Sequence, residues 1–353
     1  MIAKPKNIYF MLTYAYQVLR EGTFRSIEGE EFDNIHNLFA EIIALGVSYQ
    51  IKRGLAREYQ ENTERIGTIR GKIELTNSIP EFAKHSNKLV CTFDEYTVDS
   101  PMNRVLKTTM DLLVHSSDVK REKKDKLKIL MRYFLDVETI DPHTIAWSSF
   151  PYHRNNATYK MLMNLCYLVT MGMLLSEKDG TIKLAEYLDD QKMHALYERF
   201  ILEYFIKEHP ELKASRDKVA WNLDESSKGL IDFLPEMQTD ITIRYKEKTL
   251  IIDAKYYCQI LKKGQYGGNG KILSGNMYQI YAYVKNMDKN HTGNVEGMLL
   301  YAGTDEPVKE VRGQLIDGNK FHVRTLDLSG EWADIKNTLD EIANDFKYPK
   351  DSA

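Results

Sequence analysis

With 353 residues, 43% of them hydrophobic and 28% charged, the chain has the composition of a folded globular protein and the length of about two domains. Its formal net charge of −3 argues against a stand-alone DNA-binding protein, though not against one that a partner carries to DNA. The three dispersed cysteines form no zinc or disulfide pattern, and no apolar run is long enough for a membrane span, so we expect a cytoplasmic protein.

The first half of the chain combines helices with short strands. Apolar residues at helical spacing predict helices over residues 8–20, 32–54, 101–115 and 123–134. Gly54 fits the end of the second helix, and Ser100 fits the N-cap of the third. Short strands are predicted for Glu58-Tyr59, Arg65–Leu75 and Leu89–Phe93. Residues 1–150 are therefore predicted to form a mixed α+β domain.

A basic run, Lys120–Lys128, overlaps the last of these helices. Acidic residues are interspersed in it, and it has a helical period. Both features favour a solvated helix face over a nucleic-acid-binding patch.

After the loop-like residues 142–156, the pattern changes to helices followed by paired strands. Helices are predicted over residues 157–176, 190–209 and 275–285 and from Trp332 onward. Strands are predicted over residues 230–234, 239–245, 250–256, 295–302 and 320–326. Residues 157–349 are therefore predicted to form an α/β domain. The glycine-rich segment 264–270 lacks the spacing of a nucleotide-binding P-loop, and we interpret it as a loop beside the site described next.

Two acidic residues and a lysine fall on the two strands of a predicted hairpin. Asp253 and Lys255 alternate with Ala254, so their side chains share one face of the sheet. The apolar residues 250–252 before them are typical of a buried strand. Asp240 lies on the neighbouring strand, from which its carboxylate can approach that of Asp253. Charged groups at such a position are costly unless they meet a metal, a substrate or each other.

This residue set suits the hydrolysis of a phosphodiester. Carboxylate oxygens are ligands for Mg²⁺, and Mn²⁺ accepts the same donors. The metal polarises the phosphate and activates a water molecule, while a lysine stabilises the developing charge. We therefore predict an enzyme that depends on Mg²⁺ or Mn²⁺, with Asp240 and Asp253 as metal ligands and with Asp240, Asp253 and Lys255 as catalytic residues.

The spacing of these residues resembles that of the PD-(D/E)xK nucleases. Asp240 is followed by twelve residues and then by the triplet Asp253–Lys255, although Thr239 stands where the pattern has proline. Glu198, on the helix before the strands, matches the supporting acid of related nucleases. The segment Gln279–Tyr283 matches the QxxxY element of RecB-like members. The resemblance implies a restriction-endonuclease-like α/β fold, and it adds Glu198 and Gln279 to the expected catalytic residues.

A finer resemblance covers nearly the whole chain. The sequence is similar to the McrC subunits of the McrBC restriction systems at residues 6–15, 53–55, 69–74, 92–94, 103–104, 239–244 and 252–257. This resemblance implies an endonuclease subunit that cuts double-stranded DNA containing modified cytosine. It also implies a partner, a hexameric AAA+ GTPase motor of the McrB type, which the subunit binds and stimulates.

The first half of the chain contains no recognisable catalytic set, so we expect residues 1–150 to bind the motor. Arg70 and Lys72 are the candidate contacts, and ordinary surface cations are the alternative reading of both. Two other functions stay open at this point. One is a non-catalytic activator or scaffold of the AAA+ GTPase, and the other is a stand-alone RecB-like nuclease. The absence of an iron–sulfur cysteine set disfavours the second.

Overall fold

The chain divides into two compact units, which differ from the predicted domains. The computed structural model describes residues 3–16, 19, 24, 27, 29–84, 86–152, 156–179, 190–223, 233–256, 261–262, 271–303 and 310–349. One unit comprises Met1–Asp33 together with Thr181–Ala353, and the other comprises Asn34–Gly180. The predicted division into 1–150 and 157–349 therefore places the first helix and residues 157–179 in the wrong halves.

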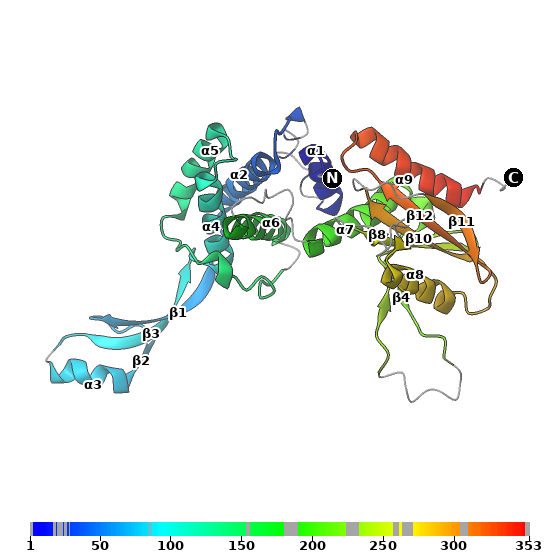
Figure 1. Ribbon diagram of the computed structural model, residues 1–353. Coiled ribbons are helices and arrows are strands. Elements are labelled where there is room, and N and C mark those ends of the chain that lie inside the picture. Colours follow the sequence, from blue (N-terminus) through cyan, green and yellow to red (C-terminus); the bar gives the residue numbers. More distant parts are fainter. Residues whose placement is uncertain are drawn as a thin grey trace. The chain divides into compact units, whose positions relative to one another are not determined.

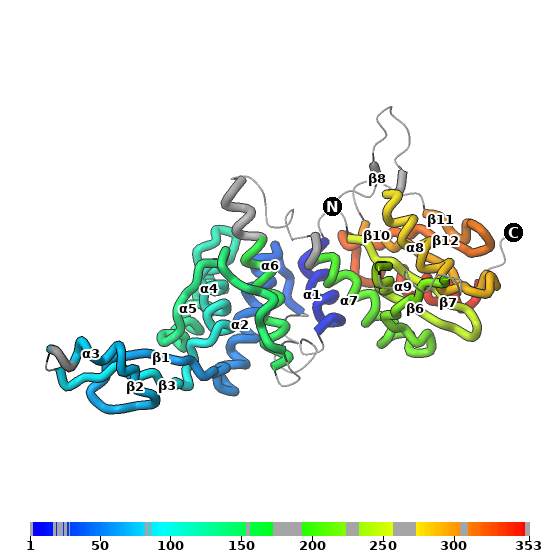
Figure 2. Tube along the Cα trace, turned by 90° about the horizontal axis from the view of Figure 1, so that it is seen from below, coloured from blue at the N-terminus to red at the C-terminus, as the bar shows by residue number. Residues whose placement is uncertain are grey.

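The unit Asn34–Gly180 has a core of packed helices, which lie side by side in Figure 2. They are α2 (Ile35–Arg53), α4 (Pro101–His115), α5 (Arg121–Met131) and α6 (Ala157–Asp179), with 3₁₀ turns at Arg132–Phe134 and Pro142–Thr144. The predicted ends of α2 and α4 are confirmed. Gly54 ends α2 with a φ of 89°, and the Ser100 hydroxyl caps α4 by accepting the Asn103 N–H.

Helix α6 belongs to this unit because its first turn is tied to the preceding segment. The Tyr159 hydroxyl donates to Asn103 Oδ1 over 2.8 Å and accepts the Ala56 N–H over 2.9 Å. Asn103 in turn donates to the carbonyl oxygens of Ala56 and Val98. A single buried network thus fixes α6 to α4.

The basic run on α5 is not uniformly solvent-exposed, which corrects the prediction for residues 120–128. The Lys123 side chain is only 4% exposed, and its Nζ lies 2.7 Å from Glu41 Oε2 on α2. Lys126 pairs with the other oxygen of Glu41 at 3.0 Å but is 51% exposed. One lysine of the run is thus part of the packing between α2 and α5.

A β-ribbon extends from these helices (Figure 1). Its strands β1 (Glu58–Ile66) and β3 (Leu89–Thr97) are antiparallel, and the two-residue strand β2 (Lys72–Ile73) pairs with β3. The predicted strand from Arg65 to Leu75 is wrong, because β1 ends at Ile66 and helix α3 (Leu75–Ala83) begins at Leu75. Gly71 makes the turn possible: its φ is 66°, and a side chain there would collide with Phe93.

The second unit is built on a mixed five-stranded sheet with the strand order β11-β12-β10-β7-β6. The strands are β6 (Ile241–Tyr245), β7 (Lys248–Lys255), β10 (Val295–Ala302), β11 (Val311–Ile316) and β12 (Asn319–Leu326). Strands β6 and β7 form the predicted antiparallel hairpin, whereas β7, β10 and β12 are parallel to one another. Two further antiparallel pairs are β4 (Lys218–Val219) with β5 (Met237–Gln238) and β8 (Leu261–Lys262) with β9 (Lys271–Ile272).

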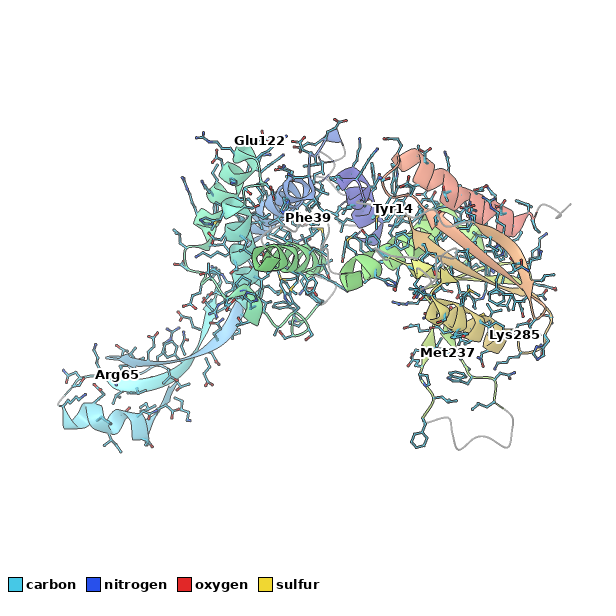
Figure 3. All side chains as sticks on the ribbon, viewed as in Figure 1. Tyr14, Phe39, Arg65, Glu122, Met237 and Lys285 are labelled. Atoms are coloured by element: carbon cyan, nitrogen blue, oxygen red, sulfur yellow. The ribbon has the colours of Figure 1, made fainter. Side chains whose placement is uncertain are left out.

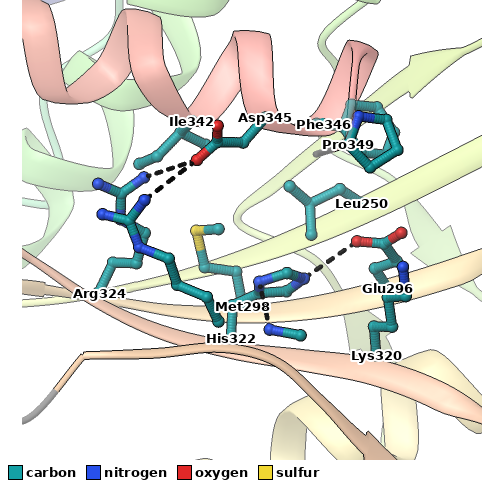
Figure 4. Close-up of a pocket in the computed structure, with 12 residues that line it drawn as sticks. Leu250, Glu296, Met298, Lys320, His322, Arg324, Ile342, Asp345, Phe346 and Pro349 are labelled. Carbon is teal, nitrogen blue, oxygen red and sulfur yellow. Dashed lines mark hydrogen bonds and ion pairs between the residues drawn. The ribbon is translucent and has the colours of Figure 1, made fainter. Parts of the chain in front are cut away.

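Helices cover both faces of this sheet. They are α7 (Asp190–Glu208), α8 (Ser274–Met287) and α9 (Trp332–Lys347), with a 3₁₀ turn at Pro210–Leu212, while α1 (Pro5–Ala15) packs on α7. Helix α8 packs on the face that carries Ile251, Leu299 and Phe321, and Lys285 lies near its end (Figure 3). Helix α9 covers the other face, where Met298 and Arg324 point toward it (Figure 4).

The first helix joins this unit through contacts with residues more than three hundred positions away. The Asn7 amide donates to the carbonyl oxygens of Leu328 and Gly330, and the Phe10 ring stacks on Trp332 at 4.7 Å. One turn after Phe10 in α1, the Tyr14 hydroxyl donates to Glu208 on α7 over 2.6 Å. These contacts explain why α1 does not pack with the residues that follow it in sequence.

The remaining predictions for the second half have mixed outcomes. The strand 295–302 is confirmed as β10, and the helices from 190, 275 and Trp332 are confirmed as α7, α8 and α9. Strand β11 was not predicted. Of the predicted strand 230–234, only residues 233 and 234 are described, and they are not in a strand. The glycine-rich segment 264–270 lies outside the described residues. No helix within the described ranges is long and apolar enough to cross a membrane.

Candidate active site

The hairpin of β6 and β7 brings the two predicted aspartates together. Ile241 pairs with Ile252, so Asp240, just before β6, lies beside the end of β7. The Ala254 N–H donates to Asp240 Oδ2 over 3.0 Å, which fixes this carboxylate against the backbone between Asp253 and Lys255. The alternation predicted for β7 also holds, because Asp253 and Lys255 form an ion pair with 2.9 Å between Oδ2 and Nζ.

Thr239, which stands where the PD-(D/E)xK pattern has proline, has a structural role of its own. The Thr239 N–H donates to the Asp217 carbonyl oxygen over 2.9 Å, and the Asp217 N–H donates to the Thr239 hydroxyl over 3.0 Å. Proline has no N–H and could make neither bond. Thr239 therefore fastens the segment that carries Asp240 to the chain at Asp217.

Helix α8 supplies the next contact of the lysine. Gln279 Oε1 accepts from Lys255 Nζ over 3.1 Å, and the Gln279 amide donates to the Tyr283 hydroxyl over 3.0 Å. Lys255 is thereby held between a carboxylate and an amide, with an exposed fraction of only 5%. The sequence predicted that Gln279 lies at this site, and the structure places it there.

Burial strongly perturbs the two carboxylic acids. Asp253 is 1% exposed and Asp240 is 9% exposed. Burial, together with the negative charges of Asp253 and Glu198, raises the pKa of Asp240 from 3.8 to about 7. Burial also raises the pKa of Asp253, against the lowering effect of Lys255. The single ammonium group of Lys255 does not compensate both carboxylates, so the pair carries excess negative charge when ionised.

The donor set fits a hard divalent cation. Although Lys255 lies close by, neither carboxylate oxygen of Asp253 accepts a well-directed hydrogen bond from the described residues. Buried carboxylate oxygens without donors are rare, and a cation would satisfy them. Asp240 and Asp253 are the residues that would hold it. Within the described ranges, no group of three or more His, Cys, Asp or Glu side chains is arranged around a common metal position.

A second group of polar residues borders the aspartates. On α7, His194 Nδ1 lies 2.8 Å from Glu198 Oε1. The other oxygen of Glu198 lies 3.1 Å from Arg216 Nη2, and the same nitrogen is 3.9 Å from Asp240 Oδ1. Glu198, predicted as a supporting acid, is therefore near the aspartates but is engaged by two basic side chains.

The predicted motor contacts Arg70 and Lys72 lie in the other unit, on its ribbon. The Arg70 guanidinium stacks over the Phe93 ring at 4.3 Å, and Lys72 forms a 3.0 Å ion pair with Glu74. Both are exposed. The two predicted sites therefore belong to different units of the chain.

Comparison with known proteins identifies the family of the chain. Residues 4–302 match the McrBC family, described as a 5-methylcytosine restriction system component. The chain belongs to the McrBC family. It is 30% identical over 342 residues to the type IV methyl-directed restriction enzyme EcoKMcrBC of Escherichia coli K12, an alignment that covers 97% of each chain.

One solved McrBC structure shows a related fold. The chain resembles one from a half-complex of a tetradecameric assembly of Thermococcus gammatolerans McrB AAA+ hexamers with bound McrC. The TM-score is 0.50 at 16% identity, and the match covers 96% of this chain and 75% of that one. A second McrBC complex from T. gammatolerans matches 58% of this chain and 59% of that one, with a TM-score of 0.41 at 17% identity.

Proposed function

We propose that this McrBC family member is the DNA-cleaving subunit of a modified-cytosine restriction complex, with a PD-(D/E)xK active site at Asp240, Asp253 and Lys255. The observation that carries the proposal is the convergence of the three side chains at the end of β7. The Asp240 carboxylate is bonded to the backbone beside Asp253, and Lys255 is paired with Asp253. Two buried acids and a lysine are costly to bring together, and a metal-bound phosphodiester would repay that cost.

Each residue has a definable task in this proposal. Asp240 and Asp253 hold Mg²⁺ or Mn²⁺, which when bound polarises a phosphate and lowers the pKa of a coordinated water. Lys255 is kept in place by Asp253 and Gln279, so its ammonium group can orient the attacking water and stabilise charge on the phosphate. Tyr283 keeps the Gln279 amide in the orientation that presents its oxygen to Lys255.

The partner proposed for the chain is an AAA+ GTPase motor of the McrB type. Support comes from the family, whose solved complexes from T. gammatolerans contain McrB hexamers with bound McrC. The net charge of −3 is consistent with a chain that is brought to DNA by another protein. The motor would move along double-stranded DNA, and this chain would cut it.

The ribbon of the helical unit is the proposed contact with the motor. Its exposed apolar and aromatic side chains include Tyr59 at 73% and Ile69 at 62% exposure, which is unusual for a free surface. Arg65, seen on the ribbon in Figure 3, and the stacked Arg70 add positive charge. An arginine presented to a bound nucleotide can speed its hydrolysis, so we propose that Arg70 stimulates the GTPase.

The nuclease proposal is tested with the complex of the full chain and its cognate GTPase. Asp253→Ala should abolish cleavage of methylated DNA in Mg²⁺ while leaving stimulation of GTP hydrolysis intact. Asp334→Asn, which removes an exposed acid from α9, is the matched control and should cut normally. Cleavage at the normal rate by Asp253→Ala would overturn the assignment of the active site.

The motor contact is tested separately by GTP turnover. Arg70→Ala should reduce the stimulation of the GTPase by at least tenfold if the guanidinium acts on the nucleotide. Lys84→Ala removes another cation from the same ribbon module and should have little effect. Equal stimulation by the wild type and Arg70→Ala would place the contact elsewhere.

A further inference from the structure

Beside the two aspartates lies a cation that the proposed chemistry does not use. The Arg216 side chain is 48% exposed, whereas that of Lys255 is 6% exposed and already engaged by Asp253 and Gln279. Arg216 Nη2 nevertheless comes within 3.9 Å of Asp240 Oδ1. Arg216 thus borders the proposed metal site on one side and water on the other.

The backbone on both sides of Arg216 is locked to the segment that carries Asp240. Ser215 and Thr242 exchange two backbone hydrogen bonds of 2.9 and 2.8 Å. On the other side, Asp217 is tied to Thr239 through both backbone and hydroxyl. The guanidinium itself donates from Nε to the Thr239 carbonyl oxygen over 3.3 Å. The arginine therefore has a fixed register relative to the aspartate.

Glu198 and His194 orient the guanidinium further. Glu198 accepts from Arg216 Nη2 through one oxygen and contacts His194 through the other. Among the described residues, none accepts a hydrogen bond from Nη1 of Arg216, whereas Nε and Nη2 both donate. An arginine held by one edge keeps its remaining N–H groups available for an incoming anion, and the planar fork suits a phosphate better than a lysine does.

The contacts of Arg216 are not explained by a large contribution to folding stability. A half-exposed ion pair contributes little to folding, because water screens the charges and the side chains lose freedom. Arg216 is held by the backbone bonds of its two neighbours, by the Thr239 carbonyl oxygen and by the Glu198 carboxylate. Neutralising the charge of Asp240 would not require so many contacts. A ligand that approaches from the open side and carries negative charge would account for it.

We propose that Arg216 binds a phosphate of the DNA backbone next to the cleavage site and that Glu198 is its positioning residue. The inference rests on the proposed nuclease function. Arg216 would contact the backbone, so it would add affinity and hold the strand over Asp240 and Asp253 without reading the base sequence. Glu198 would contribute through Arg216 and not as a metal ligand.

The first test measures binding of a fluorescein-labelled methylated duplex to the full chain in Ca²⁺ at a series of salt concentrations. Arg216→Ala should bind about tenfold more weakly at low salt, as expected for the loss of a charged hydrogen bond. The slope of log affinity against log salt should shrink by about 0.9, the value of one phosphate contact. Arg216→Lys should keep the slope and recover only part of the affinity.

The matched control is Arg312→Ala. Arg312 is also 48% exposed and paired with acids, Glu310 and Glu341, but it lies on the face covered by α9. Glu198→Gln should weaken DNA binding without changing the salt slope, because the cation stays but is no longer held. Arg216→Ala that binds like Arg312→Ala would overturn the phosphate contact, and normal affinity in Glu198→Gln would overturn the positioning role.

A second measurement keeps this proposal separate from the nuclease proposal. Mn²⁺ binding to the DNA-free chain, followed by electron paramagnetic resonance, should strengthen about fivefold in Arg216→Ala, since a cation near Asp240 is removed. Asp253→Asn should abolish Mn²⁺ binding. If Asp253→Asn binds Mn²⁺ normally, the metal site is misassigned, while the DNA-binding result for Arg216 stands on its own.

Discussion

The strongest physical consequence of the site is that Asp240→Asn should stabilise the metal-free protein while inactivating it. Asp240 is 9% exposed and its pKa is raised from 3.8 to about 7. A rise of roughly three units corresponds to about 4 kcal/mol of unfavourable free energy when the acid is ionised in the folded state. Asparagine removes that charge and still offers an oxygen to the Ala254 N–H, and the attraction of Asp240 to Lys255 is already contained in its net pKa shift. We therefore expect a net gain of about 4 kcal/mol at pH 8.

The pH dependence gives the prediction its sign. A raised pKa means that the folded protein binds the Asp240 proton more tightly than the unfolded chain does. The resulting stability is fully present below about pH 4 and is lost as the pH rises to about 7. The advantage of the asparagine variant should therefore be absent near pH 4, grow between pH 4 and 7, and stay constant above.

The assay is thermal and guanidinium unfolding of both proteins in EDTA, at pH 4.5 and at pH 8. At pH 8 the variant should melt higher by about 8–16 °C. Mg²⁺ should then stabilise the wild type by mass action and leave the variant unchanged. A variant that is less stable than the wild type at pH 8, or one whose advantage is equal at both pH values, would refute the electrostatic reasoning.

Three further outcomes are expected. After treatment with EDTA, Mg²⁺ or Mn²⁺ should restore cleavage by the complex and Zn²⁺ should not, because the proposed ligands are carboxylate oxygens; cleavage that survives thorough chelation would contradict this. Lys123→Ala should lower the free energy of unfolding by about 3 kcal/mol, because it leaves Glu41 buried with one cation fewer, whereas Lys126→Ala should cost under about 1 kcal/mol; equal losses would show that burial does not set the strength of these pairs. Thr239→Pro, which introduces the proline of the PD-(D/E)xK pattern, should lower the free energy of unfolding by about 2 kcal/mol through the lost bonds to Asp217 and should slow cleavage. Urea unfolding and cleavage rates measure both effects, and an unaffected variant would show that the bonds to Asp217 are dispensable.

The centre of the site could be predicted because it depends on local geometry. Two-residue alternation places Asp253 and Lys255 on one face of any strand, and a short hairpin brings Asp240 beside them. Gln279 followed from a motif on the next helix. Each of these inferences needs only the spacing of residues within one element or between neighbouring elements.

Arg216 was not predicted because its position depends on pairing between segments. Its flanking residues Ser215 and Asp217 bond to Thr242 and Thr239, more than twenty positions later. A lone arginine in a short irregular stretch carries no periodicity, and the bridge that positions it involves backbone atoms of any residue type. The signal in the sequence is Thr239 itself, because a threonine where the PD-(D/E)xK pattern has proline offers an N–H for such a bond.

The predicted domain boundary was wrong for a related reason. The spacing of Ile8, Met11 and Leu12 predicts that α1 has an apolar face, but it does not say which surface that face covers. The answer depends on Leu328, Gly330 and Trp332, which lie at the far end of the sequence. In α5, likewise, the composition of the basic run could not reveal that Lys123 meets an acid on another helix.

The contacts between α1 and residues 328–332 also determine the order in which the two units can fold during synthesis. Asn34–Gly180 is an insertion between the first helix and the rest of the unit that carries the candidate active site, and it forms a compact unit of its own. A ribosome adding about 5–20 residues per second would release that segment well before Leu328 and Trp332 exist. Helix α1 can meet α7 earlier, but its contacts with Leu328, Gly330 and Trp332 must wait until the last part of the unit has been made. The unit proposed to bind the motor can therefore fold on the nascent chain before the unit proposed to cut DNA is complete, so a translating polysome would carry docking surfaces before it carries complete candidate active sites.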